Sequence, residues 1–244
     1  MIDAVIFDKD GTLFDFRASW GAWTDSLMAE LVAGGADPAR LVAVLGYDPA
    51  TKHFAPDSPV IAQTTPEIAD LLVPHLPGVT VEALNARMNA LAATAPMQPA
   101  VDLPGVLGAL RHRGLVLGLA TNDTEIPARA HLRGAGVLDL FSFVAGCDSG
   151  FGGKPAPGQL LAFARICGLD PARVAMVGDS LHDLEAARAA GMPAVAVLTG
   201  IAVAVDLAPF ADVVLADIGG LQAWMDGLSV SQARIAPKND TISS

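Results

Sequence analysis

The sequence predicts an α/β fold, with a doubly wound, mainly parallel sheet and an inserted helical domain. Three observations support this prediction. Short apolar runs alternate with helical patterns, which is typical of a parallel sheet covered on both faces. The region after the first run, about residues 16–100, has helical periodicity and few β-branched runs. With 244 residues, 52% of them hydrophobic, the chain can form one large domain or a core with a smaller second domain.

Six apolar runs are expected to form the strands. The first spans residues 4–7 and ends directly at Asp8, as is typical of a strand buried on both faces. The others span residues 115–120, 174–177, 194–198 and 213–215, with a weaker candidate at 142–145.

Helical patterns separate the later strands. They cover residues 106–112, 125–134, 157–167 and 181–190. Gly168 and Gly191 stand where two of these helices should stop. Strand and helix therefore alternate along the second half of the chain.

The inserted region, residues 16–100, is expected to be a mainly helical insert. Periodic apolar positions predict helices at 18–32, 66–73 and 81–93, and the stretch 96–99 has the proline content of a hinge. The Rossmann-like core then consists of residues 1–15 and 101–228. The polar, aperiodic tail, residues 229–244, is expected to be flexible and poorly ordered.

The composition restricts the partners and the chemistry. A formal net charge of -11 disfavours nucleic acid and anionic membrane surfaces. We find no secretory signal and no run of about 18 uncharged apolar residues, so we expect a cytoplasmic protein without a membrane span. The two cysteines form no CxxC pair, which disfavours zinc and redox chemistry. A monomer and a homodimer both remain open.

Two acidic pairs follow predicted strands. Asp8 and Asp10 stand two apart at the end of the first strand, where period-2 alternation sends them to one side and Lys9 to the other. Asp179 and Asp183 follow the strand at 174–177 and share a face if a helix has started. Oxygen ligands alone suit a hard cation, and Mg²⁺ fits best where phosphate completes its shell.

Two other strand ends offer groups for phosphate. Thr121 and Asn122 supply a hydroxyl and consecutive backbone N–H groups just before a helix, which is a natural anion site. Lys154 lies on a glycine-rich loop and can neutralise phosphate charge. Taken singly, Thr121 suits a helix cap and Lys154 a solvated loop; only the combination points to a phosphate site.

The ordered set of motifs resembles the haloacid dehalogenase superfamily of hydrolases. The four motifs of that family match Asp8, Asp10, Gly11, Thr12 and Leu13, then Thr121, then Lys154, then Gly178, Asp179 and Asp183. Their order is similar to the phosphoglycolate-phosphatase-like branch, whose helical cap is inserted between the first and second motifs. The resemblance covers residues 1 to about 228, with the cap matched only by position and helical character.

The resemblance implies a Mg²⁺-dependent phosphatase that acts on a small phosphorylated metabolite. It implies that Asp8 attacks phosphorus and becomes a phospho-aspartate, while Asp10 acts as general acid and then general base. The Asp8 carboxylate, the Asp10 backbone carbonyl and Asp179 would hold the metal, with Asp183 orienting its shell. Thr121, Asn122 and Lys154 would form the phosphate-binding site.

Some points stay open at the level of sequence. A β-phosphoglucomutase-like phosphomutase shares these core motifs, while a dehalogenase or a non-catalytic binding protein fits less well. The physiological substrate depends on the cap. The resemblance also places Asp123 where relatives often carry lysine or another residue, which puts contacts with the leaving group in doubt, and Gly158 where relatives often have an acidic residue. His182 is expected to face solvent, and Trp20 to pack in the cap.

Overall fold

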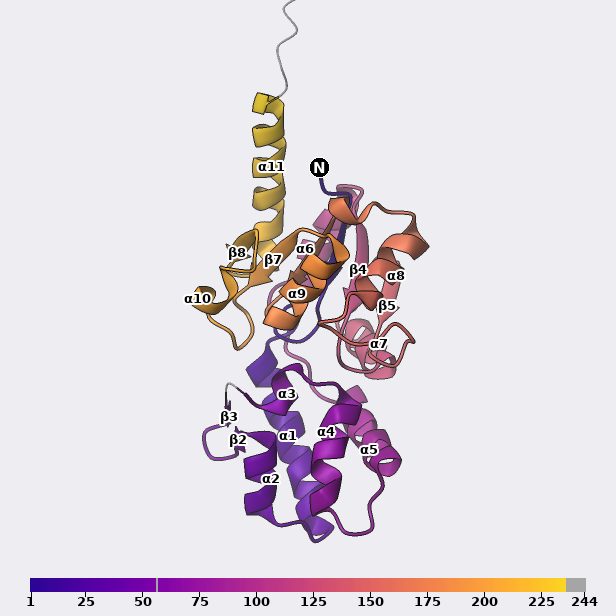
Figure 1. Cartoon of the computed structure of the whole chain (residues 1–244), viewed down its shortest axis with the longest axis vertical. Helices are drawn as coiled ribbons and strands as arrows, with labels where there is room; N and C mark the ends of the chain where they lie inside the picture. The colour runs from indigo at the N-terminus through magenta and orange to yellow at the C-terminus, as the bar shows by residue number, and fades with distance from the viewer. Residues whose placement is uncertain (56, 236–244) are drawn as a thin grey trace, which may run out of the picture.

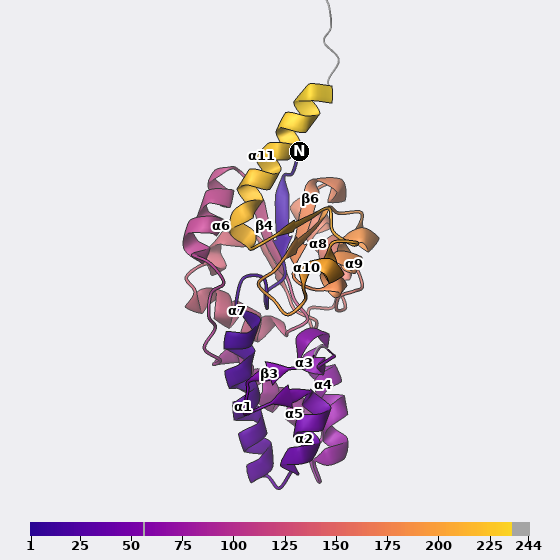
Figure 2. The ribbon, with the colours of Figure 1, turned by 90° about the vertical axis from the view of Figure 1, so that its left-hand side faces the viewer.

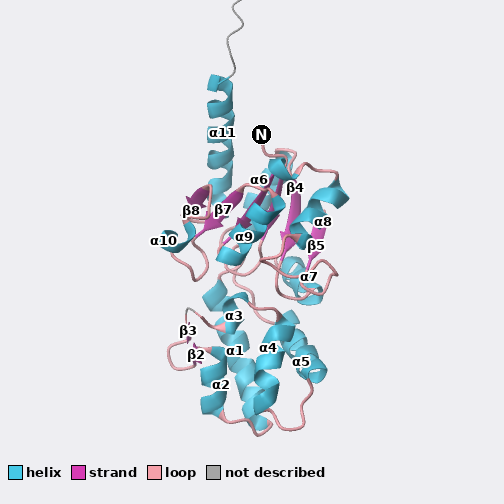
Figure 3. Ribbon diagram, viewed as in Figure 1, coloured by secondary structure: helices cyan, strands magenta, loops and turns pink. Residues whose placement is uncertain are grey.

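The computed structural model describes residues 1–55 and 57–235, and it has a six-stranded parallel sheet in the order β5-β4-β1-β6-β7-β8 (Figures 1 and 3). All six predicted strands are confirmed, the weak candidate included. Phe7 is in register with Leu119 on one side and Val177 on the other, so three strands end side by side. The strands are β1 (Ala4–Phe7), β4 (Val116–Ala120), β5 (Phe143–Ala145), β6 (Val174–Gly178), β7 (Ala194–Val197) and β8 (Val213–Leu215).

Helices cover both faces of the sheet (Figure 2). Alternate residues of β1 point to opposite faces, since Val5 and Phe7 join one buried apolar cluster while Ala4 and Ile6 join the other. The first cluster includes helices α6 (Leu103–His112), α7 (Glu125–Gly134) and α11 (Leu221–Ile235). The second includes α8 (Gly158–Cys167), α9 (Leu181–Ala190) and α10 (Ala204–Leu207). This arrangement confirms the predicted doubly wound fold.

Residues 16–95 form a second body, the helical lobe, which lies beyond the carboxyl ends of the strands (Figures 1 and 3). It has its own buried apolar cluster, separate from the two clusters at the sheet. Its helices are α1 (Phe16–Ala33), α2 (Pro38–Leu45), α3 (Pro59–Ala62), α4 (Thr65–Leu72) and α5 (Val81–Ala93). The three helices predicted in this region are confirmed as α1, α4 and α5.

The sequence prediction missed the smaller elements of the lobe. Helix α2 has eight residues and α3 has four, too few for apolar periodicity to stand out. Between them lies a short antiparallel hairpin, β2 (Tyr47–Asp48) with β3 (His53–Phe54). The structure also contains 3₁₀ turns at Val73–His75, Leu138–Leu140, Pro171–Arg173 and Ile218–Gly220.

Two adjacent chain segments connect the lobe to the sheet. The Asp15 N–H donates to the Gln98 carbonyl at 2.8 Å, and the Ala100 N–H donates to the Leu13 carbonyl at 2.9 Å. The segment expected to be a hinge therefore pairs with the chain that leaves the first motif.

The C-terminal prediction needs a correction. Helix α11 continues to Ile235, so residues 229–235 are helical rather than irregular, and residues 236–244 of the predicted tail lie outside the described residues. Residues 229–235 are too few for helical periodicity to stand out in the sequence. Within the described residues, none of the helices combines the length and apolar character that crossing a membrane requires.

Candidate active site

Three buried carboxylates meet at the ends of β1 and β6. Asp8 follows β1, Asp179 follows β6, and Asp183 lies in the first turn of α9. One oxygen from each of the three lies within 4.8 Å of the other two. The parallel register produces this meeting, because the Asp8 N–H continues the ladder by donating to the Val177 carbonyl at 2.8 Å. The predicted union of the first and fourth motifs is therefore present in the structure.

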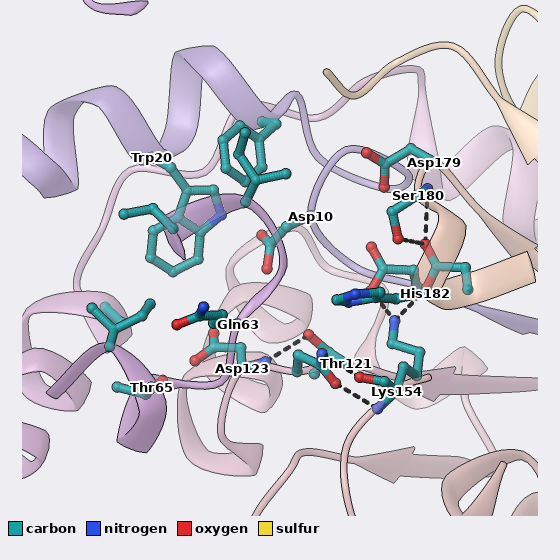
Figure 4. Close-up of a pocket in the computed structure, with 18 of the residues that line it drawn as sticks. Asp10, Trp20, Gln63, Thr65, Thr121, Asp123, Lys154, Asp179, Ser180 and His182 are labelled. Carbon is teal, nitrogen blue, oxygen red and sulfur yellow. Dashed lines mark hydrogen bonds and ion pairs between the residues drawn. The ribbon is translucent and has the colours of Figure 1, made fainter. Parts of the chain in front are cut away.

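Lys154 joins this cluster from the loop between β5 and α8 (Figure 4). Its Nζ lies 2.5 Å from Asp8 Oδ1 and 2.7 Å from Asp183 Oδ1, and it donates to the Ala120 carbonyl at 2.9 Å. Only 6% of the residue is exposed, so it is a buried counter-charge rather than a solvated loop lysine.

The side chain of Asn122 fixes the position of Lys154. Its Nδ2 donates to the Lys154 carbonyl at 2.9 Å, and its Oδ1 accepts from the Lys154 N–H at 2.8 Å. Thr121 precedes it and is 1% exposed, with its Oγ1 accepting from the Asp123 N–H at 3.1 Å. The second and third motifs thus meet the acidic cluster at the same edge of the sheet.

The electrostatics of the cluster suit a cation. Burial raises the pKa of Asp8 to about 7, with Lys154 opposing the shift and Asp183 adding to it. Burial, together with Asp8 and Asp183, also raises the pKa of Asp179 well above its usual range. Burial lowers the pKa of Lys154, but Asp183 and Asp8 outweigh it and raise that pKa overall. Three carboxylates that face one ammonium group leave an excess of negative charge, which a divalent cation would offset.

Two glycines allow backbone to approach Asp179. Gly11 has φ +85°, and a Cβ there would lie 2.4 Å from Asp179 Oδ2. A Cβ at Gly200, in the loop after β7, would lie 1.7 Å from the same oxygen. Thr199 joins the two loops by donating to the Gly11 carbonyl at 2.6 Å. Gly11 belongs to a predicted motif, whereas nothing in the sequence pattern around Gly200 connects it with the acidic pairs.

Asp10 lies outside the three-carboxylate cluster, although it shares the cavity with Asp8. Its Oδ2 lies 3.0 Å from the Nζ of Lys9, while its Oδ1 is buried without a hydrogen-bond partner among the described residues. The predicted group of four carboxylates is therefore a group of three with Asp10 apart. Strand alternation does not extend to residue 10, because β1 ends at Phe7.

Lys9 forms a second buried ionic cluster, which the sequence prediction missed. Besides Asp10, its Nζ contacts Asp123 Oδ2 at 2.8 Å and His131 Nδ1 at 2.9 Å, and it lies 5.1 Å from the Trp20 ring centroid. Lys9 is completely buried. Asp123, whose role the sequence left open, is thus the partner of a lysine that comes from the first motif.

The cavity at this site is lined by the sheet ends and by the helical lobe (Figure 4). His182, expected to face solvent, lines it instead, with its Nδ1 buried and unpartnered among the described residues. Trp20 both packs in the lobe and lines the cavity, whereas Arg17 is exposed and outside the lining. The lobe residues that line the cavity are Phe16, Trp20, Trp23, Val60, Ile61, Gln63, Thr65, Ile68, Met88 and Ala92.

Gly158, noted above as a departure from the pattern of the family that the sequence resembles, has a steric explanation. Gly158 is the first residue of α8, and a Cβ there would lie 2.0 Å from the Phe151 carbonyl oxygen. The loop that carries Lys154 therefore passes too close to this helix end to admit a side chain at position 158.

Comparison with known proteins agrees with this geometry. Residues 2–191 match the family model of haloacid dehalogenase-like hydrolases. A phosphoglycolate phosphatase of Rhodospirillum rubrum is 34% identical over 205 residues, which are 82% of this chain and 81% of that protein. A predicted phosphoglycolate phosphatase from Haemophilus somnus has a similar structure, with a TM-score of 0.72 at 19% identity, covering 92% of this chain and 98% of that one. A putative β-phosphoglucomutase from Thermotoga maritima also shares the fold, with a TM-score of 0.65 at 18% identity over 93% of this chain and all of that one (100%).

The chain belongs to the haloacid dehalogenase-like hydrolases, as the family match and the ordered motifs both require. Within that family it is a phosphatase of the phosphoglycolate-phosphatase-like branch, given its similarity to the Rhodospirillum rubrum enzyme over four-fifths of both chains.

Proposed function

We propose that the enzyme hydrolyses a small phosphate monoester with Mg²⁺, through a phospho-aspartate on Asp8. The supporting observation is the buried cluster of Asp8, Asp179 and Asp183, in which Lys154 bridges Asp8 and Asp183, at the base of a cavity that the helical lobe covers. In this account residues 1–15 and 101–228 are the catalytic core, and residues 16–100 are the cap.

The donor set fits Mg²⁺, because it offers carboxylate oxygens without a cysteine and carries more negative charge than Lys154 offsets. Asp8, Asp179 and the backbone carbonyl of Asp10 would hold the ion directly, and Asp183 would hold its shell in place. When bound, the ion supplies positive charge to the phosphoryl oxygens.

In the first step a carboxylate oxygen of Asp8 attacks phosphorus, and the bond from phosphorus to the alcohol oxygen breaks. Asp10 gives its proton to that oxygen, so the alcohol leaves neutral. The unpartnered Asp10 Oδ1 at the cavity wall is a suitable donor position. In the second step Asp10 takes a proton from water, whose oxygen attacks phosphorus and frees Asp8 and inorganic phosphate.

The phosphoryl oxygens need positive charge and N–H donors. Lys154 supplies the charge, and Thr121 supplies its hydroxyl. The side chain of Asn122 is engaged with the Lys154 backbone, so its part in the phosphate site is to keep Lys154 in place.

A phosphatase fits these residues better than a mutase, a dehalogenase or a non-catalytic protein does. A mutase of the same fold would transfer phosphate between positions of a bound sugar and release little of it. A dehalogenase needs neither a metal nor Asp10, and a non-catalytic protein would not require the full set of groups. We propose a cytoplasmic monomer or homodimer that does not bind nucleic acid or membranes.

The test is phosphate release from a generic aryl phosphate, with Mg²⁺ and with EDTA. We expect Mg²⁺-dependent release by the wild type and a loss of at least about 1,000-fold in Asp8→Asn, because the nucleophile is gone. Asp206→Asn, at an exposed position of α10, is the matched control and should retain full activity. Release that survives Asp8→Asn would contradict the mechanism.

A further inference from the structure

The two walls of the cavity differ in chemistry. The wall formed by the core carries carboxylates, Lys154, Thr121 and His182. The wall formed by the helical lobe is apolar apart from Gln63 and Thr65 (Figure 4). Its apolar members are Phe16, Trp20, Trp23, Val60, Ile61, Ile68, Met88 and Ala92.

The lobe wall offers no fixed positive charge. Among the described residues that line the cavity, Lys154 is the single lysine or arginine, and it belongs to the core wall. Lys9 lies nearby but is completely buried, is engaged by Asp10 and Asp123, and faces the Trp20 ring. Arg17, at the start of α1, is exposed and lies outside the lining.

These surroundings disfavour a second anionic group on the substrate. With the phosphate at Asp8 and Lys154, the alcohol part lies toward Asp10 and the lobe wall. A carboxylate there would be desolvated against apolar side chains without a lysine or arginine as ion partner. An aromatic or other apolar group would instead bury its surface against Trp20 and its neighbours.

The lobe wall also offers one hydrogen-bond donor. The indole nitrogen of Trp20 is buried without a hydrogen-bond partner among the described residues, and it faces the side of the cavity where Asp10 lies (Figure 4). An indole N–H is a donor only, so it can serve an acceptor oxygen of the substrate, such as a hydroxyl or ether oxygen, but it supplies no positive charge.

We propose that the enzyme selects phosphate monoesters whose alcohol carries a neutral apolar or aromatic group, and discriminates against esters with a second anionic group, phosphoglycolate among them. This selection rests on the proposed phosphatase function. It makes the lobe wall, with Trp20 at its centre and Gln63 at its exposed edge, the determinant of specificity.

The test compares benzyl phosphate with phosphoglycolate, which differ only in phenyl against carboxylate on the same CH₂–O–phosphate unit. We expect kcat/KM to favour benzyl phosphate by about 100-fold or more, because an unpaired buried charge is rejected more strongly than a poorly fitting apolar group. Equal values, or a preference for phosphoglycolate, would overturn the proposal while leaving the phosphatase function intact.

Two variants sharpen this comparison. Trp20→Leu should lower kcat/KM for benzyl phosphate by about tenfold, because an aromatic contact is lost. Gln63→Arg should raise kcat/KM for phosphoglycolate by about tenfold by supplying the missing cation at an exposed position, whereas the matched Gln63→Ala should not. A failure of Gln63→Arg to raise it above Gln63→Ala would count against the proposal.

Binding measurements with stable phosphonates test this inference independently of the proposed phosphatase function. Phenylethylphosphonate and phosphonopropionate reproduce the two test esters with CH₂ in place of the ester oxygen. In calorimetric titrations with Mg²⁺ we expect the phenyl compound to bind at least about tenfold more tightly. This result would support the lobe-wall selection even if neither ester were hydrolysed, whereas equal or weaker binding of the phenyl compound would overturn it.

Discussion

The core wall and the lobe wall of the cavity have different tasks. The core wall gathers carboxylates and Lys154 at strand ends whose register is fixed by the sheet. The lobe wall presents apolar side chains from α1, α3, α4 and α5, connected to the sheet by two adjacent segments. In the proposed function the chemistry depends on the sheet and the substrate choice on the helices, so changes in the two walls should have separable effects.

After Asp8→Asn, the largest effect is expected for Asp10→Asn, also a change in the core wall. It removes the acid that protonates the leaving alcohol, so kcat/KM for benzyl phosphate, which reports the steps up to transfer of the phosphoryl group to Asp8, should fall roughly 1,000-fold. An aryl phosphate with a good leaving group should lose less in kcat/KM, because its oxygen needs no proton in the first step. Steady-state kinetics with both esters checks this; equal losses of kcat/KM on the two would contradict the role of Asp10 as acid.

Lys9→Met should have the next largest effect, on stability. The change leaves Asp10 and Asp123 buried without their shared cation, which should lower the free energy of unfolding by about 3 kcal/mol. Lys52→Met is the matched control, because it removes an exposed lysine paired with Asp25 and should cost less than about 1 kcal/mol. Urea unfolding measures both variants. Similar losses of unfolding free energy would show that the Lys9 cluster contributes no more to stability than an exposed ion pair.

The core wall should also link Mg²⁺ binding to pH. The pKa of Asp8 is raised to about 7 in the folded protein without metal, against 3.8 as its ordinary value, so the folded state binds more protons. The stability from this group is present at low pH and is lost as the pH rises toward 7. Because Mg²⁺ needs the ionised carboxylate, its stabilising effect should grow by at least about 1 kcal/mol between about pH 5 and pH 8.

Thermal unfolding with and without Mg²⁺ across that pH range measures the effect. Subtracting one series from the other removes the contribution that titrating groups remote from the site make to stability. Asp8→Asn should reduce the dependence on pH. A stabilisation by Mg²⁺ that is the same at both ends of the range would contradict the proposed ligand set.

The smallest effect is expected where the lobe meets the core. Thr124 at the start of α7 donates to Asn89 Oδ1 of α5 at 2.8 Å. Asn89→Ala should raise KM about threefold with kcat retained, because one hydrogen bond that holds the lobe over the site is lost. Asn85→Ala, on the same helix, is the control, because its Oδ1 has no hydrogen-bond partner among the described residues. A change in kcat alone would point to a different role for this contact.

The difference between the two walls also explains what the sequence could predict. The strands and the groups that follow them were predictable, because Asp8, Thr121 and Asp179 each stand directly after a recognisable apolar run. In a parallel sheet such positions meet at one edge whatever lies between them in the chain. The same reasoning could not identify Gly200, which approaches Asp179 from a loop without a charged residue.

The lobe wall was not predictable in this way. Trp20 and Ile68 have the spacing of ordinary core positions, and they do pack in the lobe cluster while also lining the cavity. Apolar periodicity therefore cannot separate a core residue from a cavity residue. The buried Lys9 cluster was hidden for another reason, since its partners Asp123 and His131 come from more than a hundred residues away.

The central claim is that Asp8 carries the phosphoryl group, and the direct test is to trap that intermediate. Asp10→Asn is mixed with an aryl phosphate and Mg²⁺, quenched in acid, reduced with borohydride and mapped by peptide mass spectrometry. The account predicts that Asp8 is converted to homoserine, because borohydride reduces an acyl phosphate but not a free carboxylate. Phosphate release from the ester without any modified Asp8, or with the modification at another residue, would contradict the account.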